Sequence, residues 1–304
     1  MTTGVLLMTY GAPRDDADLP RYLAAVRGGR APEASLVAEM ARRYAAIGGS
    51  PLVARTVSQA AALEVALGPE YAVEAGMRFS EPTIADAVAA LGGRGASHVV
   101  GICMSPQWSP LLMGGYERAL RAACDAAGLR SSIAGAWHRE PRFVAALASR
   151  VAAALREIPD AFVLLTAHSL PRRVFEAEPD YIAQLRETGE LVAAASGVAG
   201  GRWRWAYQSA GHTQEDWLRP DLVELFPEIA AAGTRDVIVM PVQFLADHLE
   251  VLYDLDVAAA AQARAAALRY HRPPMLNSDP MLAASLAATV RETEAALLAA
   301  RPGA

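Results

Sequence analysis

The chain has 304 residues, of which 53% are hydrophobic and 20% charged, and its formal net charge at pH 7 is -5. This length suits two domains of ordinary size or one large one. A negative balance gives no electrostatic footprint for nucleic acid or an anionic membrane surface, so we expect small-molecule partners. No apolar run approaches the roughly 18 to 20 residues of a membrane span, and Met1 to Gly4 show no signal-peptide pattern. We therefore expect a cytoplasmic protein without a transmembrane segment.

The cysteine and lysine content limits which metal sites and which anion-binding side chains the protein can have. The two cysteines, Cys103 and Cys124, lack the CxxC spacing of a zinc or iron-sulfur site, and we read them as buried thiols. All 28 basic residues are arginine, so any anion that is bound by a cationic side chain is bound by a guanidinium.

Short apolar runs alternate with helical stretches along the chain. Buried strands are predicted at residues 5–10, 71–79, 98–104, 131–137, 162–167, 202–207 and 237–241. Helices are predicted at 82–91, 116–127, 141–158 and 280–300, among others, and a Gly/Ser-rich loop at 196–201. This alternation predicts an α/β fold with doubly wound parallel sheets covered by helices on both faces.

The strand runs of the two halves follow a similar order, which suggests an internal duplication. Met104-Ser105-Pro106 ends the third run of the first half, as Met240-Pro241 ends that of the second. We predict two similar domains, residues 1–138 and 139–279, with a cleft between them. The helix at 280–300 could pack back on the first domain or on the second.

An acidic block, DHLEVLYDLD at residues 247–256, follows the last predicted strand. On an α-helix, Asp247, Glu250 and Asp254 would share one face, where like charges repel and favour a nearby cation. An acidic first turn that complements the helix dipole explains the block equally well. His248 would be turned roughly 200° from Glu250 on such a helix, and we predict a structural or supporting role for it.

His168 directly follows the strand predicted at 162–167. Ligands of open α/β sheets lie beyond the carboxyl ends of the strands, so His168 is placed where chemistry would occur. A lone histidine is more often structural, but the block that contains Glu250 follows a strand in the same way. We therefore consider the two residues together.

Five separated motifs resemble those of the ferrochelatases, and most closely the monoderm bacterial type that metallates coproporphyrin. They are VLLMTYGAP at 5–13, YAAIGGSPL at 44–52, AHSLP at 167–171, YQSAG at 207–211 with Trp217-Leu218, and the acidic block. The resemblance implies two Rossmann-like domains around a porphyrin cleft and insertion of ferrous iron into the macrocycle. It also implies that His168 and Glu250 face the porphyrin nitrogens as catalytic and metal-binding residues, with Tyr10 on the other face of the ring.

Metallation removes two pyrrole protons and supplies a divalent ion. A neutral imidazole can bind the metal or accept a proton, and a neighbouring carboxylate favours both events, so the sequence leaves open which role His168 and Glu250 each take. The pair also suits zinc or cobalt. Asp254 could extend the metal site as a path of carboxylates, or it could be a solvated acid. Many relatives carry a further acid where this chain has Ala258, which places the outer part of such a path in doubt.

The carboxylate rim of a porphyrin suits arginine. Arg30 and Arg43 match propionate-binding arginines of similar proteins, although isolated arginines are more often solvated. Ser50 and Tyr116 are expected as hydrogen-bonding neighbours of the rim.

Trp108 and Met113 could add apolar contact with the ring or could be plain core. The sequence departs from the family at a shortened Gly48-to-Pro51 loop, at Phe79 in place of histidine, and at His212 in the turn that it forms with Gly211 and Thr213.

The resemblance makes porphyrin and Fe2+ substrates, with no permanently bound cofactor and no iron-sulfur cluster. We expect a monomer that makes transient contact with other enzymes of heme synthesis. Alternatives are a protoporphyrin IX ferrochelatase, a non-catalytic tetrapyrrole carrier, and a cobalt or sirohydrochlorin chelatase. The carrier would lack His168 or Glu250, and the last class would carry more metal-site histidines.

Overall fold

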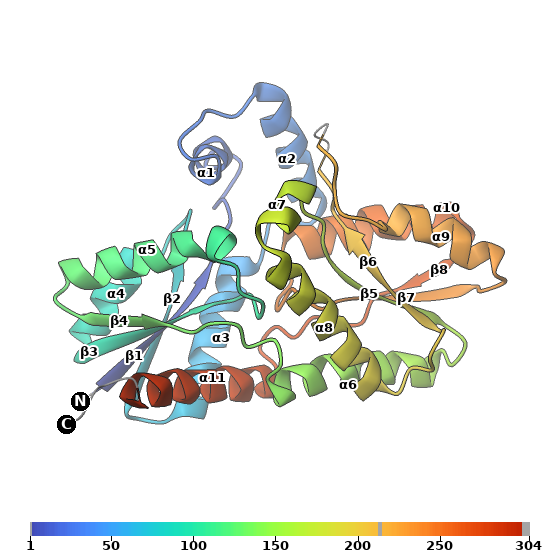
Figure 1. Ribbon diagram of the computed structural model, residues 1–304. Helices are drawn as coiled ribbons and strands as arrows, with labels where there is room; N and C mark the ends of the chain where they lie inside the picture. Colours follow the sequence, from blue (N-terminus) through green and yellow to red (C-terminus); the bar gives the residue numbers. More distant parts are fainter. Residues whose placement is uncertain (1, 212–214, 300–304) are drawn as a thin grey trace. The chain divides into compact units, whose positions relative to one another are not determined.

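A computed structural model describes residues 2–211 and 215–299, which divide into two compact units (Figure 1). Unit 1 is built from the described residues of Met1–Glu140 and Asn277–Ala304, and unit 2 from those of Pro141–Leu276. His212 and Thr213, noted as a departure in the sequence, lie outside the described residues.

The centre of unit 1 is a four-stranded parallel sheet with the order β2-β1-β3-β4. Its strands are β1 (Thr2–Thr9), β2 (Tyr71–Met77), β3 (Ala96–Cys103) and β4 (Arg130–Ile133). Its helices are α1 (Leu19–Val26), α2 (Ala34–Ala46), α3 (Leu52–Leu67), α4 (Ile84–Gly93), α5 (Pro110–Ala126) and α11 (Pro280–Ala299).

Helices cover both faces of this sheet. α4 and α5 pack together on one face, and α3 and α11 on the other (Figure 1). Val5, Leu6 and Leu7 are consecutive and fully buried, because a sheet covered on both sides buries residues of either pleat. α11 therefore completes unit 1 although it comes last in the chain.

Unit 2 has a parallel sheet of the same size with the order β6-β5-β7-β8. Its strands are β5 (Phe162–His168), β6 (Trp203–Gln208), β7 (Asp236–Pro241) and β8 (Arg269–His271). Its helices are α6 (Pro141–Glu157), α7 (Arg172–Ala177), α8 (Pro179–Ser196), α9 (Leu222–Ala231), the π-helix η1 (Glu250–Ala259) and α10 (Ala260–Ala265).

The helices of unit 2 are also divided between two faces (Figure 1). α6 and α8 pack together against β5 and β7, whereas α9, η1 and α10 enclose a separate apolar cluster that includes Leu164, Phe226 and Leu255. In each sheet the first strand of the unit lies second in the order and the second strand lies at the edge. The predicted α/β class with doubly wound parallel sheets is confirmed, and the shared order is what a duplication would produce.

Three local predictions need correction. The strand predicted at 131–137 ends at Ile133, and only Ala134 continues its bonding, with a hydrogen bond from its N–H to Gly101 O. The three-residue strand β8 was missed, because three residues are too few to show a period. The helix expected over the acidic block begins at Glu250 and is a π-helix, so the α-helical spacing assumed for Asp247, Glu250 and Asp254 does not apply.

Candidate active site

His168 is the last residue of β5, at the carboxyl edge of the sheet of unit 2. Its backbone N–H donates to Gln243 Oε1 at 2.9 Å, and Gln243 Nε2 bonds Tyr181 Oη at 2.7 Å. Its ring Nδ1 lies 2.5 Å from the carbonyl oxygen of Ser169. A carbonyl can only accept, so Nδ1 carries a proton and the neutral ring presents the Nε2 lone pair on its other side.

Glu250 faces that lone pair from the first turn of η1. Its Oε1 lies 3.6 Å from His168 Nε2. A carboxylate oxygen and an imidazole lone pair are both acceptors, so this arrangement is favourable only when a proton or another cation is shared between them. The fold of unit 2 thus brings together an imidazole and a carboxylate that are distant in the chain.

A second imidazole, that of His248, contacts the same carboxylate. His248 Nε2 lies 3.4 Å from Glu250 Oε2, and its Nδ1 lies 3.0 Å from the carbonyl oxygen of Ala246. The ring also stands edge-on to Phe244, with centroids 4.4 Å apart. The expectation that His248 turns away from Glu250 is wrong, because His248 precedes the π-helix and does not follow helical rotation.

The two imidazoles decide the charge of Glu250. Burial raises the pKa of Glu250, but the positive charge that His168 carries when its Nε2 takes up a proton, together with the hydrogen bond and charge of His248, outweighs that effect and lowers the pKa to about 2. Glu250 is therefore a carboxylate at neutral pH and can attract a divalent cation. Among residues 2–211 and 215–299, no three His, Cys, Asp or Glu side chains form a ready-made metal cluster.

The other acidic residues of the block have different surroundings. Asp254 and Ala258 are half-buried on η1. Asp256 bonds Arg272 through both carboxylate oxygens, and Asp247 lies before the helix with Oδ1 3.7 Å from Arg272 Nη2. The acidic block therefore does not present its carboxylates on a single face. Glu250 faces histidines, whereas Asp247 and Asp256 face Arg272.

In unit 1, Tyr10 and Tyr116 come together at the carboxyl end of the sheet. Tyr10 follows β1 and is 48% exposed, and its ring centroid lies 6.3 Å from that of Tyr116 on α5 and 5.0 Å from that of Phe79. Tyr116 is buried, which raises its pKa well above the ordinary value. The two tyrosines form an aromatic wall, of which Tyr10 is the exposed part that a flat ring could contact.

Sequence reasoning missed Arg78, which lies beside this wall. Its guanidinium carbon is 4.9 Å from the Phe79 ring centroid and 5.2 Å from that of Tyr116. A Cβ at Gly115 would lie 2.0 Å from Arg78 Nη2, so the guanidinium occupies space that only glycine leaves open. Arg78 follows β2, and the rule that selected His168, a polar residue at a strand's carboxyl end, would also have found it.

The remaining rim candidates have local partners. Arg43 Nε bonds Glu39 Oε1 at 2.8 Å on α2, and Arg30 Nε bonds the carbonyl oxygen of Arg27 at 3.3 Å. Ser50 Oγ accepts from Leu52 N at 3.4 Å, where α3 begins.

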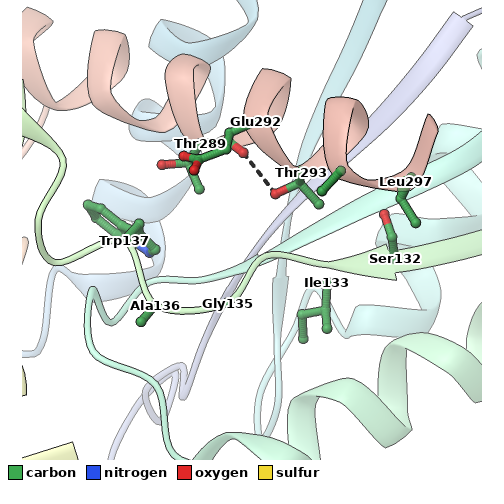
Figure 2. A pocket seen from close by; sticks show the side chains of 10 residues that line it. Ser132, Ile133, Gly135, Ala136, Trp137, Thr289, Glu292, Thr293 and Leu297 are labelled. Carbon is green, nitrogen blue, oxygen red and sulfur yellow. Dashed lines mark hydrogen bonds between the residues drawn. The ribbon is translucent and has the colours of Figure 1, made fainter. Parts of the chain in front are cut away.

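A cavity of about 350 Å³ lies in unit 1 between α11 and the segment that follows β4 (Figure 2). Residues Ser132, Ile133, Gly135, Ala136, Trp137, Thr289, Glu292, Thr293, Ala296 and Leu297 line it. None of the predicted site residues is among them.

The chain resembles proteins of known function. Residues 2–294 match the ferrochelatase family over nearly the whole chain. The chain belongs to the ferrochelatase family. A ferrochelatase from Deinococcus radiodurans is 36% identical over 96% of both chains, and a coproporphyrin III ferrochelatase from Geobacillus kaustophilus is 36% identical over 95% of both.

Solved structures agree on the fold. SirB from Bacillus subtilis, solved with Fe3+, superimposes with a TM-score of 0.59 at 14% identity, covering 99% of this chain and 98% of its own. CbiX, described as the terminal enzyme of siroheme biosynthesis in denitrifying bacteria, gives 0.58 at 15%, covering 96% and 99%. At such identity the likeness concerns the chelatase fold alone.

Membership makes this ferrochelatase an enzyme, a lyase of heme biosynthesis whose substrates are a porphyrin and iron. The predictions of family, enzyme class and porphyrin metallation are confirmed, and the carrier alternative is excluded. No helix in the described part of the chain is long and apolar enough to cross a membrane.

Proposed function

We propose that this ferrochelatase inserts ferrous iron into coproporphyrin III to form coproheme, with His168 and Glu250 as catalytic and metal-binding residues. The observation that carries the proposal is the 3.6 Å approach of His168 Nε2 to Glu250 Oε1, two acceptors that need a cation or proton between them. Coproporphyrin III is favoured because several relatives about as similar as the first, including that of Geobacillus kaustophilus, are named for it.

Charge balance defines what His168 and Glu250 must do during metallation. One Fe2+ enters the macrocycle and two pyrrole protons leave, so the site must lose a dication and take up protons. The Nε2 lone pair of His168 can bind the cation or accept a proton, and the carboxylate of Glu250 is suited to holding the cation. The low pKa of Glu250 keeps it ionised and able to hold the cation before transfer.

Asp254, four residues beyond Glu250 on η1, is proposed as the next oxygen ligand on the route by which hydrated iron approaches. Carboxylate oxygens are suitable partners for a hydrated divalent ion. Ala258, four residues further, supplies no ligand, so the route on this helix consists of Asp254 and Glu250.

Tyr10 and Tyr116 are proposed to contact the macrocycle, and Arg30, Arg43 and Ser50 its propionates. Arg78 is a further candidate, because its guanidinium lies against the rings of Phe79 and Tyr116. Coproporphyrin has four propionates and protoporphyrin two, so a site with several guanidinium groups favours the former.

The test is anaerobic metallation by purified protein with ferrous iron and either coproporphyrin III or protoporphyrin IX, followed by visible absorbance. We expect a kcat/KM at least tenfold higher for coproporphyrin III. Equal or reversed values would contradict the substrate assignment and leave the protoporphyrin alternative.

A further inference from the structure

Arg272 directly follows β8, and its side chain is only 11% exposed. Its Nε donates to Asp256 Oδ1 at 2.5 Å, and its Nη2 donates to Asp256 Oδ2 at 2.8 Å. Its Nη1 donates to the carbonyl oxygen of Pro273 at 3.0 Å. The same Nη2 lies 3.7 Å from Asp247 Oδ1, which is an ion-pair distance and not a hydrogen bond.

These two carboxylates bracket Glu250 in the chain. Asp247 precedes it by three residues, and Asp256 follows it by six within η1. A guanidinium is planar, and its bidentate bond fixes the direction of the carboxylate as well as its distance. Arg272 therefore fastens η1, at a point six residues beyond Glu250, to the edge of the sheet.

A π-helix needs such support from outside. Its i→i+5 bonding is rare over more than one turn, and η1 extends over ten residues. No side chain caps its first turn. Val251, Leu255 and Ala259 are buried and hold one side of the helix, while the bond from Arg272 to Asp256 holds another.

We propose that Arg272 is a positioning residue for iron insertion, which, through its bidentate bond to Asp256, sets the rotation of η1 that presents the Glu250 carboxylate to His168 and His248. The inference rests on the role proposed above for Glu250. Arg272 itself contacts neither iron nor porphyrin in this proposal.

The main variant is the double substitution Arg272→Met with Asp256→Leu. Removing one member of a largely buried ion pair leaves the other charge uncompensated, whereas replacing both with apolar chains is commonly tolerated. We expect a folded protein whose kcat for metallation falls at least tenfold, while KM for the porphyrin changes less than twofold. Arg272→Lys, which keeps the charge but not the planar fork, should give an intermediate kcat.

The matched control is Arg269→Gln, at the start of β8 and three residues before Arg272. Arg269 bonds Asp236 at the amino end of β7, so its loss removes an ion pair of unit 2 without touching η1. Its kcat should stay within twofold of wild type. An equal loss of kcat in this control would show a general effect of weakening unit 2 and would overturn the inference.

The decisive measurement repeats the double substitution in a Glu250→Gln background. If Arg272 acts through Glu250, the substitution lowers the residual rate no further, and a second reduction of the same size would overturn the inference. If Glu250→Gln removes activity and the Arg272 variants keep wild-type kcat, only this inference fails. If Glu250→Gln itself keeps wild-type activity, the proposed role of Glu250 fails and this inference with it.

Discussion

At the scale of single residues, the site depends on which ring nitrogen of each histidine is already engaged. Backbone carbonyls hold the Nδ1 atoms of His168 and His248, so both Nε2 atoms are directed at one carboxylate. The backbone thereby fixes the tautomer that a metal-binding or proton-accepting imidazole needs.

His168→Ala and Glu250→Gln should each lower the rate of iron insertion by roughly 10²-fold or more, the usual contribution of a positioned acid or base. Porphyrin binding, measured separately by fluorescence titration, should change little. His98→Gln is the control, since His98 lies on β3 of unit 1 with Nε2 3.0 Å from Ser132 Oγ. Retained turnover in either site variant would remove that residue from the mechanism.

At the scale of elements, the helix ends show how local sequence fixes local structure. Thr83 caps α4, where its hydroxyl accepts from Asp86 N at 3.1 Å and donates to Asp86 Oδ2 at 2.7 Å. The backbone N–H of Thr83 donates to the same Oδ2 at 2.9 Å. The spacing of a capping box is thus sufficient to begin the helix here.

Thr83→Ala should lower the free energy of unfolding by about 1 kcal/mol at neutral pH, the usual cost of a lost cap. The hydrogen bonds from Thr83 lower the pKa of Asp86. A carboxyl whose pKa is depressed on folding adds stability above its unfolded value, near ~3.9, and loses it as pH falls through the folded value.

The difference between Thr83→Ala and wild type should therefore shrink on acidification toward pH 3, as measured by urea unfolding at several pH values. Thr83→Ser keeps the hydroxyl and should behave like wild type. A difference that is constant with pH would mean that the carboxylate does not contribute to the cap.

At the scale of the whole molecule, unit 1 is assembled from two distant parts of the chain. Leu282, Leu286 and Val290 of α11 are at most 1% exposed, and α11 packs against α3 and β3. Glu294 of the same helix accepts hydrogen bonds from Thr3 at 3.0 Å and Tyr71 at 2.7 Å. The core of unit 1 is therefore incomplete until the last helix has been synthesised.

Leu286→Ala should lower the free energy of unfolding by about 2 to 5 kcal/mol, the cost of a cavity at a fully buried position. Leu298→Ala on the same helix is the control, since Leu298 is 67% exposed and should cost less than about 0.5 kcal/mol. Chemical unfolding followed by circular dichroism measures both. Similar values for the two variants would contradict the packing of α11 as described.

The fold class could be predicted from the sequence alone, and so could the approach of His168 to Glu250. Uninterrupted apolar runs such as Phe162 to Leu165 must be buried on both faces, which leaves few arrangements other than parallel sheets between helices. A strand that ends on His168 and an acidic block after another strand then direct both groups to the same sheet edge. These inferences succeed because they depend on period and order along the chain.

Three features could not be predicted from the sequence: the helix type of η1, the turn of His248 toward Glu250, and the pairing of Asp256 with Arg272. A π-helix and an α-helix differ by one residue in each hydrogen-bonded ring, and side-chain pattern over ten residues does not distinguish them. The choice depends on contacts with residues far along the chain, such as Arg272 beyond β8. Such contacts form when the sheet brings its strands together, and no local spacing encodes them.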